Sequence, residues 1–199
     1  MYNALDCSVF RLDETHRFYT STLPNHLILS EDEFDDLWAD RPDKYHKILM
    51  HGREVDTPRW QQAFGHDYDY TGRVNYARPL LPVLEPLVCW CQNEIDERLN
   101  GVLVNWYDAS LLHYIGKHRD SIKDMSVGCP IVTLSFGGSR TFRLRPWKGA
   151  GYQDFQARNG SLFIMPFRTN EAYTHEVLRL KGDEGRRISV TLRGFESKN

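Results

Sequence analysis

Short segments rich in Val, Ile, Phe and Thr fill the chain from residue 101 to residue 195, and they constrain the fold more than any other feature. Gly, Pro or Asn-Gly separates them, and Asn159-Gly160 predicts a two-residue hairpin turn. The segments are VLVNWY, PIVTLSFGG, TFRLRPW, YQDFQA, SLFIMPF and RRISVTLRGF. Such short, closely spaced strands predict an antiparallel sandwich or barrel, so we expect a mainly β protein of the α+β class.

The first hundred residues carry a different pattern. Residues 1–30 hold short alternating stretches that predict one or two strands. Ser30 followed by Glu33 resembles a capping box, so a short helix is expected to begin there and to end before Pro42. Residues 80–100 place apolar side chains at helical spacing, which predicts an amphipathic helix of about five turns. Between these helices, we expect an irregular hairpin and a tyrosine-rich loop or edge strand.

Length and charge limit the class of protein. The 199 residues suffice for a single domain, which we expect to be monomeric, and no apolar stretch is long enough to span a bilayer. We expect an intracellular protein, cytoplasmic or nuclear, because no secretory signal is visible and the cysteines form no disulfide or zinc framework. A net charge of −2 gives no support for extended DNA binding. The local cluster of basic residues is either a binding face or a solvated strand face: Arg140, Arg143, Arg145 and Lys148.

The sequence His118-Arg119-Asp120 is the first candidate for chemistry. In an extended segment, residues two apart point to the same side, so an imidazole and a carboxylate can converge on one ion. His175, which follows the apolar segment SLFIMPF, is the best candidate for a third ligand. Two histidines and one carboxylate on one face of an octahedron form the facial triad of non-haem Fe(II) oxygenases. By itself, the His-x-Asp pair is equally compatible with a surface pair.

The segment Arg187–Arg193 is the second candidate. Its polar residues alternate with apolar ones and would share one face of a strand: Arg187, Ser189, Thr191 and Arg193. Two arginines on an inward face require anions, and a dicarboxylate cosubstrate would supply them. Taken alone, the pattern also fits an edge strand with both arginines in water. Together with the candidate triad, it favours a buried cosubstrate site.

With these features, the chain resembles the AlkB family of Fe(II)/2-oxoglutarate-dependent dioxygenases, most closely its eukaryotic duplex-DNA repair branch. The resemblance runs from about Gly52 to Phe195 and is carried by Asn105-Trp106-Tyr107, YIGKHRD, PIVTLSFG, GSLFIM, TNEAYTH and RRISVTLR. It implies a double-stranded β-helix (jelly-roll) core over residues 101–195. It also implies an N-terminal helix and a hairpin lid over residues 46–78 that recognises the substrate.

The same resemblance implies roles for individual residues. The iron ligands would be His118, Asp120 and His175, and these would be the catalytic residues together with Arg193. The contacts to 2-oxoglutarate would be Asn105, Tyr107, Arg187, Thr191 and Arg193. Fe(II), 2-oxoglutarate and O2 would then support oxidative demethylation of N-alkylated nucleic-acid bases, with release of formaldehyde, succinate and CO2.

The resemblance also suggests substrate contacts at His51, Tyr68, Tyr70 and Ile122. A base removed from its stack needs flat side chains around it, which His51, Tyr68 and Tyr70 would provide; the alternative is that they are loop aromatics. Ile122 stands where the repair enzymes carry an acidic residue, so one electrostatic reason to prefer a cationic base is missing. Two alternatives therefore stay open: the same oxygenase acting on a protein side chain or small molecule, and a binding module without metal.

Overall fold

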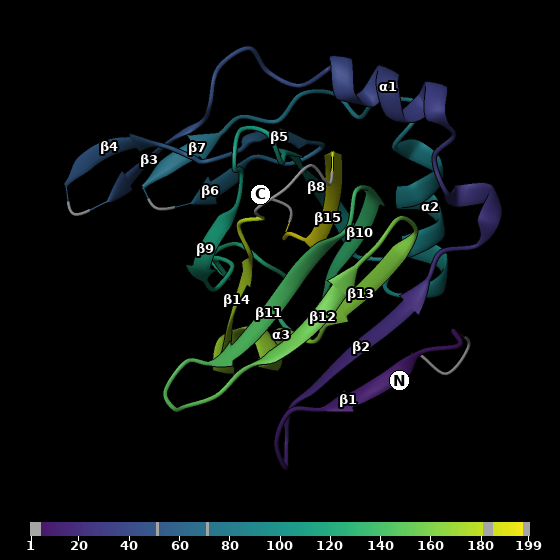
Figure 1. Cartoon of the computed structure of the whole chain (residues 1–199). Helices are drawn as coiled ribbons and strands as arrows, with labels where there is room; N and C mark the ends of the chain where they lie inside the picture. The colour runs from purple at the N-terminus through teal and green to yellow at the C-terminus, as the bar shows by residue number, and fades with distance from the viewer. Residues whose placement is uncertain (1–4, 51, 71, 181–184, 197–199) are drawn as a thin grey trace.

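The computed structural model describes residues 5–50, 52–70, 72–180 and 185–196, and these form two facing antiparallel sheets (Figure 1). The larger sheet has the strand order β1 (Ser8–Arg11), β2 (Arg17–Thr22), β13 (Ser161–Met165), β10 (Ile131–Gly137), β15 (Arg186–Gly194), β8 (Leu99–Asp108) and β5 (Trp60–Phe64). The smaller sheet has the order β12 (Gln153–Ala157), β11 (Arg140–Pro146), β14 (Tyr173–Val177) and β9 (Ile115–His118). This is the predicted mainly β, jelly-roll type of core.

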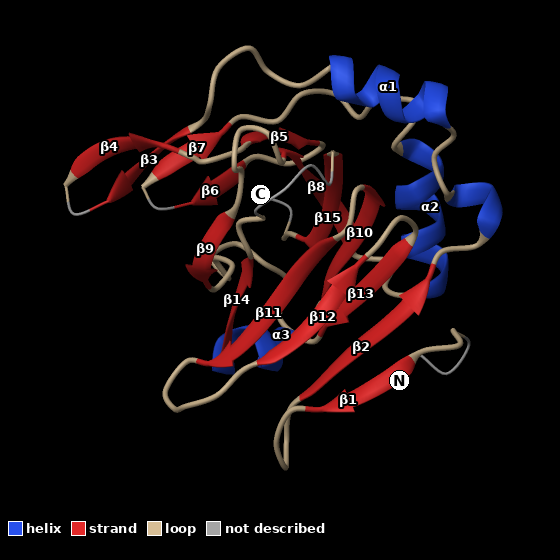
Figure 2. Cartoon of the chain, in the orientation of Figure 1, coloured by secondary structure: helices blue, strands red, loops and turns tan. Residues whose placement is uncertain are grey.

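The helices lie outside the larger sheet, as Figure 2 shows for α1 (Glu31–Ala39) and α2 (Glu85–Glu94). The predicted capping box at Ser30 is confirmed, because Ser30 and Glu33 bond reciprocally at the start of α1. Leu37 in α1 accepts a hydrogen bond of 2.9 Å from Nε1 of the buried Trp106. A turn of 3-10 helix, η1 (Asn25–Leu27), and the short α3 (Phe167–Ala172) complete the helical elements of the described residues.

The helix predicted over residues 80–100 is shorter than expected. α2 covers only Glu85–Glu94 and has Pro86 in its first turn, where a missing N–H costs nothing. At the other end the chain turns back so that β8 can begin at Leu99, and Arg98 and Asp96 pair across that turn at 2.7 Å. The apolar residues in 80–84 and 95–100 are therefore spaced as in a helix because they are buried between the helices and the larger sheet, and not because α2 continues through them.

Residue parity on the larger sheet separates two cores. Even-numbered residues of β8, β10, β13 and β15, such as Val104, Leu134 and Val190, pack under α1 and α2. Odd-numbered residues of the same strands, such as Leu103 and Phe163, face the smaller sheet. Because successive side chains of a strand alternate between its faces, each strand contributes to both cores. Polar side chains at odd positions therefore point into the space between the two sheets.

The turn at Asn159-Gly160 joins the sheets and does not close a hairpin. β12 pairs with β11, whereas β13 pairs with β10 and β2, so the hairpin predicted between these two strands is wrong. The local signal is still correct, because Gly160 adopts a φ of 77°, which favours glycine. The Asn159 side chain accepts a hydrogen bond of 3.1 Å from the Gly137 backbone, which joins the turn to β10.

Two hairpins extend beyond the sheets on one side of the molecule (Figure 1): β3 (Lys47–Met50) with β4 (Arg53–Asp56), and β6 (Tyr68–Tyr70) with β7 (Arg73–Asn75). The predicted tyrosine-rich loop or edge strand is thus a hairpin. These hairpins lie in the region 46–78, which also contains β5 of the larger sheet, and the function of this region as a substrate lid stays a prediction. Among the helices of the described residues, none combines the length and the apolar composition of a membrane-spanning segment.

Candidate active site

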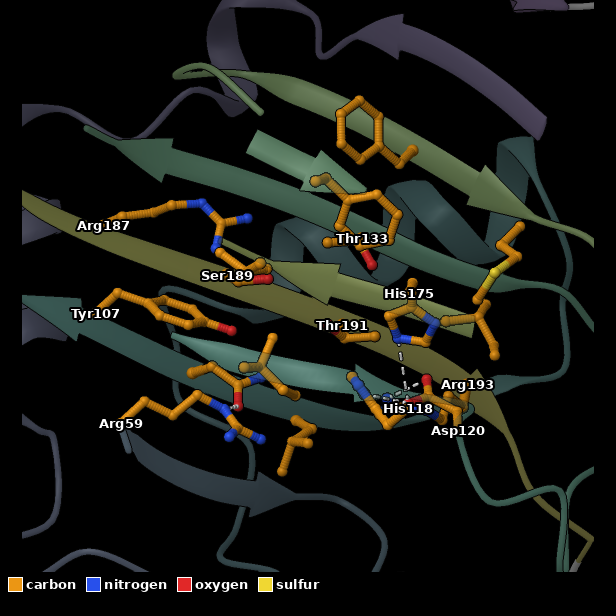
Figure 3. Close-up of a pocket in the computed structure, with 18 of the residues that line it drawn as sticks. Arg59, Tyr107, His118, Asp120, Thr133, His175, Arg187, Ser189, Thr191 and Arg193 are labelled. Carbon is orange, nitrogen blue, oxygen red and sulfur yellow. Dashed lines mark hydrogen bonds and ion pairs between the residues drawn. The ribbon is translucent and has the colours of Figure 1, made fainter. Parts of the chain in front are cut away.

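A pocket between the two sheets gathers the polar side chains at odd positions (Figure 3). Its lining residues come from both sheets, and the space between them is partly open to solvent. β8 contributes Asn105 and Tyr107, and β15 contributes Arg187, Ser189, Thr191 and Arg193. The predicted shared face of the Arg187–Arg193 segment is therefore confirmed, and that face is buried.

His118, Asp120 and His175 meet at one end of this pocket, and their ligand atoms all lie within 4.8 Å of one another. Asp120 Oδ1 lies 3.4 Å from Nε2 of His118 and 3.6 Å from Nε2 of His175. His118 and His175 are opposite each other in the pairing of β9 with β14, so a backbone register brings them together. Two imidazole nitrogens and one carboxylate oxygen converging in this way can hold a divalent transition metal.

Neighbouring groups hold the candidate ligands in place. Nδ1 of His118 lies 2.8 Å from the Gly116 carbonyl oxygen, to which it donates, so Nε2 is the nitrogen that can accept a metal. Asn170 brackets the backbone of Asp120, accepting from its N–H at 3.0 Å and donating to its carbonyl at 3.1 Å. Asn170 was not among the predicted site residues, because its contact with Asp120 spans 50 residues and follows no local pattern.

The protonation states of the two buried ligands suit a metal. Burial opposes ionisation of Asp120, but the Arg193 guanidinium and the two imidazoles hold its pKa well below the usual range. Burial lowers the pKa of His175 to about 3, so its imidazole is neutral at physiological pH. Metal ligands must be an ionised carboxylate and neutral imidazoles, and both of these residues meet that condition before any metal arrives.

Arg187 lies at the other end of the pocket and is completely buried. Its Nη2 donates to Ser135 Oγ at 2.9 Å, whereas its Nε and Nη1 have no hydrogen-bond partner among the described residues. Burial lowers the pKa of Arg187 to about 10, which leaves the guanidinium charged at neutral pH. A buried cation with unsatisfied N–H groups is costly, and a carboxylate is the acceptor that compensates both its charge and its free N–H groups. The site therefore fits one end of a dicarboxylate.

Arg59 is a further buried arginine of the pocket, and it was not among the predicted site residues. Its Nε donates to Asn105 Oδ1 at 2.8 Å and its Nη2 donates to Gln61 Oε1 at 2.9 Å. Arg59 precedes β5, which pairs with β8 so that Gln61 lies opposite Asn105. Only this long-range pairing brings Arg59 to the pocket, so no local signal could have located it.

The converging metal ligands and the buried Arg187 agree with the protein family whose sequence pattern this chain matches. The family model described as the 2OG-Fe(II) oxygenase superfamily matches residues 29–193. The chain belongs to this superfamily. Its members use Fe(II), 2-oxoglutarate and O2, and the two ends of the pocket fit the first two of these. The converging ligand atoms suit Fe(II), and the unsatisfied N–H groups of Arg187 suit the distal carboxylate of 2-oxoglutarate.

Two relatives within the superfamily share the name DNA oxidative demethylase ALKBH2. The human protein is 28% identical over 158 residues, which cover 74% of this chain and 60% of the relative. The mouse protein is 30% identical, and the match covers 74% of this chain and 66% of the relative. The chain thus spans less than two thirds of the length of these relatives. They confirm the predicted resemblance to the AlkB family.

A solved structure, that of OsALKBH1, superposes on the chain with a TM-score of 0.60. The match covers 94% of this chain and 100% of the other, at 13% sequence identity. At this level of identity, the comparison shows a shared fold. It supports the jelly-roll architecture of the 2OG-Fe(II) oxygenase and leaves the roles of individual residues to the geometry of the pocket.

The predicted substrate residues lie in different places. Tyr68 is buried in the pocket, with its ring 4.5 Å from the Arg193 guanidinium carbon. Ile122 is 42% exposed and lies in a separate groove on the outer side of His118 and Asp120. His51 lies outside the described residues, as does the side chain of Tyr70. The structure therefore brings one of the four predicted substrate contacts into the pocket.

Proposed function

We propose that the chain is an Fe(II)/2-oxoglutarate-dependent dioxygenase that oxidatively demethylates N-alkylated bases of nucleic acid. The observation that carries the chemistry is the joint presence, in one pocket, of the converging triad and of Arg187 with two unsatisfied N–H groups. A metal site alone would fit many enzymes. The buried arginine adds a specific requirement for a carboxylate in the same pocket, which 2-oxoglutarate meets.

In this proposal His118, Asp120 and His175 hold the metal, and Arg187 holds the distal carboxylate of 2-oxoglutarate. Asn105, Tyr107 and Thr191 line the space between them and would position the cosubstrate. When bound, Fe(II) with 2-oxoglutarate and O2 supplies the oxidation, which yields succinate, CO2 and, from an N-methyl group, formaldehyde. The protein residues orient the reactants in a pocket whose lining residues are mostly buried.

The relatives named as DNA oxidative demethylases support a nucleic-acid substrate. Tyr68 supports it too, because its ring offers a flat surface close to the candidate metal site. Lys123 pairs with Asp69 at 2.9 Å, which joins the segment after Asp120 to the β6–β7 hairpin. The predicted lid is therefore linked directly to the chain segment that carries the metal ligand. A nuclear or cytoplasmic location and a monomeric state stay predictions.

The test is turnover of defined oligonucleotides. The protein is incubated with Fe(II), 2-oxoglutarate, ascorbate and oligonucleotides containing 1-methyladenine or 3-methylcytosine, and formaldehyde and succinate are quantified together. We expect both products in equal amounts, and none from a His118→Ala variant. Succinate without loss of methyl from any nucleic acid would overturn the substrate and retain the oxygenase, whereas unchanged turnover by His118→Ala would overturn the proposed triad.

A second candidate is the same chemistry on a protein side chain or a small molecule. The exposed, apolar Ile122 beside the metal ligands favours it, because an apolar side chain does not attract a cationic base. The net charge of −2 favours it as well, because a negative charge does not attract phosphate. This candidate predicts weak oligonucleotide binding that changes little with salt. Binding that weakens steeply with salt, as counterion release requires, would count against it.

A further inference from the structure

A groove lies on the outer side of His118 and Asp120, separate from the pocket between the sheets. Both residues line the inner pocket and also this groove, whereas His175 and Arg187 line the inner pocket alone. The groove runs between the segment 117–122, the β11–β12 connection and α3, and Figure 1 shows this connection projecting beside α3. The candidate metal ligands therefore form the wall between a cosubstrate pocket and an outer surface.

Trp147 and Arg119 form an exposed stacked pair in this groove. The Arg119 guanidinium carbon lies 4.2 Å from the centre of the Trp147 ring, and Trp147 is 51% exposed. The backbone N–H of Trp147 donates to the Ala172 carbonyl at 2.8 Å, and Arg119 Nη1 donates to the Glu171 carbonyl at 2.9 Å. Both members of the pair are thus fixed at the end of α3, although a large part of the indole ring faces solvent.

The charges around this pair are mainly positive. Lys117, Arg119 and Lys148 are exposed, and the nearby acid Glu171 already pairs with Arg168 at 3.2 Å. The basic residues of β11 behave differently. Arg143 pairs with Asp154 at 2.6 Å and Arg145 with Glu176 at 2.8 Å, so neither is a free cation. The exposed basic residues of this part of the chain that lack an acidic partner among the described residues therefore lie in the groove, as Lys117 and Arg119 do, or next to it in sequence, as Lys148 does, and not on the face of β11.

We propose that the Trp147–Arg119 pair is a stacking platform for an unpaired nucleobase of single-stranded nucleic acid, beside the nucleotide that enters the active site. This inference rests on the proposed function and extends it to a strand-binding surface. Indole rings and guanidinium planes both stack on bases. Lys117 lines the groove and the exposed Lys148 follows Trp147 in the chain, so both lysines would meet phosphates of a strand bound there. A peptide backbone has neither bases to stack on the Trp147–Arg119 pair nor phosphates to contact the lysines.

The platform is tested by fluorescence anisotropy with a labelled, unmethylated, single-stranded oligonucleotide of about 12 nucleotides, a length typical of single-strand sites. Trp147→Ala should weaken binding by roughly 5- to 100-fold, which is the usual effect of one base–aromatic stack, and Trp147→Phe should weaken it less. Tyr152→Ala is the matched control. Tyr152 is 56% exposed, stacks with Arg143 and belongs to the same connection, but it lines a different hollow, so its loss should leave binding unchanged.

Salt dependence separates stacking from charge. Trp147→Ala should leave the slope of log affinity against log salt as it is in the wild type, whereas Lys148→Gln should reduce that slope by about 0.7. Equal binding by Trp147→Ala and wild type would overturn the platform, and so would equal losses in Trp147→Ala and Tyr152→Ala. Either result can occur while formaldehyde is still released from methylated oligonucleotides. Failure of the platform and failure of the proposed demethylation are thus distinguishable.

Discussion

Arg193 donates two hydrogen bonds to one oxygen of Asp120, at 3.0 Å from Nε and 2.5 Å from Nη2, and both side chains are buried. The bonds occupy Oδ2, so Oδ1 is the oxygen that faces the two histidines. Arg193 was predicted both as a catalytic residue and as a cosubstrate contact. The structure shows it as the partner of a candidate metal ligand, and its contact with 2-oxoglutarate stays a prediction.

Removing Arg193 should therefore destabilise the metal-free protein more than the metal-loaded one. Arg193→Met leaves the Asp120 carboxylate buried without its counterion, which typically costs about 3–5 kcal/mol of unfolding free energy. A divalent metal supplies a new counterion, so Co(II) should restore part of that loss in chemical denaturation. Arg143→Met is the control, because its partly exposed ion pair with Asp154 should cost less than about 1 kcal/mol and ignore Co(II). Equal losses with and without Co(II) would contradict the assignment.

Arg187 should lower the free energy of unfolding when no carboxylate is bound beside it. Arg187→Met removes a buried cation with two unsatisfied N–H groups, so the free energy of unfolding without 2-oxoglutarate should stay the same or rise. The KM for 2-oxoglutarate should rise by roughly 10- to 100-fold, because each charge-assisted hydrogen bond is worth about 1.5–3 kcal/mol. Thermal melts should show that 2-oxoglutarate stabilises the wild type and not this variant. A fully retained thermal shift in Arg187→Met would exclude Arg187 as the carboxylate partner.

A site residue can be predicted from the sequence when its position follows from residues close to it in the chain. It cannot be predicted in this way when its position depends on the pairing of distant strands. The shared face of Arg187 and Arg193 is a property of one strand with a period of two, so a local pattern predicts it. The meeting of His118 with His175 requires the pairing of β9 with β14, which no local pattern specifies. His175 was therefore only the best candidate for the third ligand until the family resemblance assigned it. Neither a local pattern nor the family resemblance gave Arg59 a role in the site. Arg59 reaches the pocket only because β5 pairs with β8.

The two errors in the predicted fold have the same origin. Asn159-Gly160 indicates the turn correctly, but a turn does not determine which strand its neighbours pair with. In a two-sheet core, consecutive strands can belong to different sheets, and the hairpin interpretation fails there. In the segment 80–100, apolar residues before and after α2 are buried in the core between the helices and the larger sheet, so they show apolar spacing although they are turn or strand and not helix. The spacing of apolar residues therefore indicates which residues are buried more directly than it indicates their secondary structure.

The metal-free protein should lose stability in mild acid. Burial lowers the pKa of three histidines: His46, His113 and His175, the last to about 3. Between these folded values and the unfolded value near 6.5, the unfolded chain binds more protons, so unfolding becomes easier as pH falls. Each histidine contributes at most about 1.4 kcal/mol per pH unit, and the half-buried His46 contributes less.

Urea denaturation from about pH 7 to about pH 5 measures this dependence. His113 suits a variant because it is buried away from the metal ligands, with Nδ1 accepting from the Asp108 backbone at 3.1 Å and Nε2 lying 2.9 Å from the Tyr45 hydroxyl. His113→Gln keeps a polar side chain without a titrating group, so the decline in unfolding free energy should be shallower. An unchanged decline would mean that His113 does not contribute to the acid sensitivity.

Arg59 should act on the cosubstrate through Asn105. Its Nε–H donates to Asn105 Oδ1, so the amide is held with its NH2 group available to the pocket. Arg59→Met frees that amide and removes the partner of Gln61 Oε1, and the KM for 2-oxoglutarate should rise. Asn105→Ala should raise it as well. Because both changes remove the same positioned donor, Arg59→Met should add little in the Asn105→Ala background, a coupling of about 0.5–3 kcal/mol. Additive effects on KM would instead mean that Arg59 acts on 2-oxoglutarate independently of Asn105.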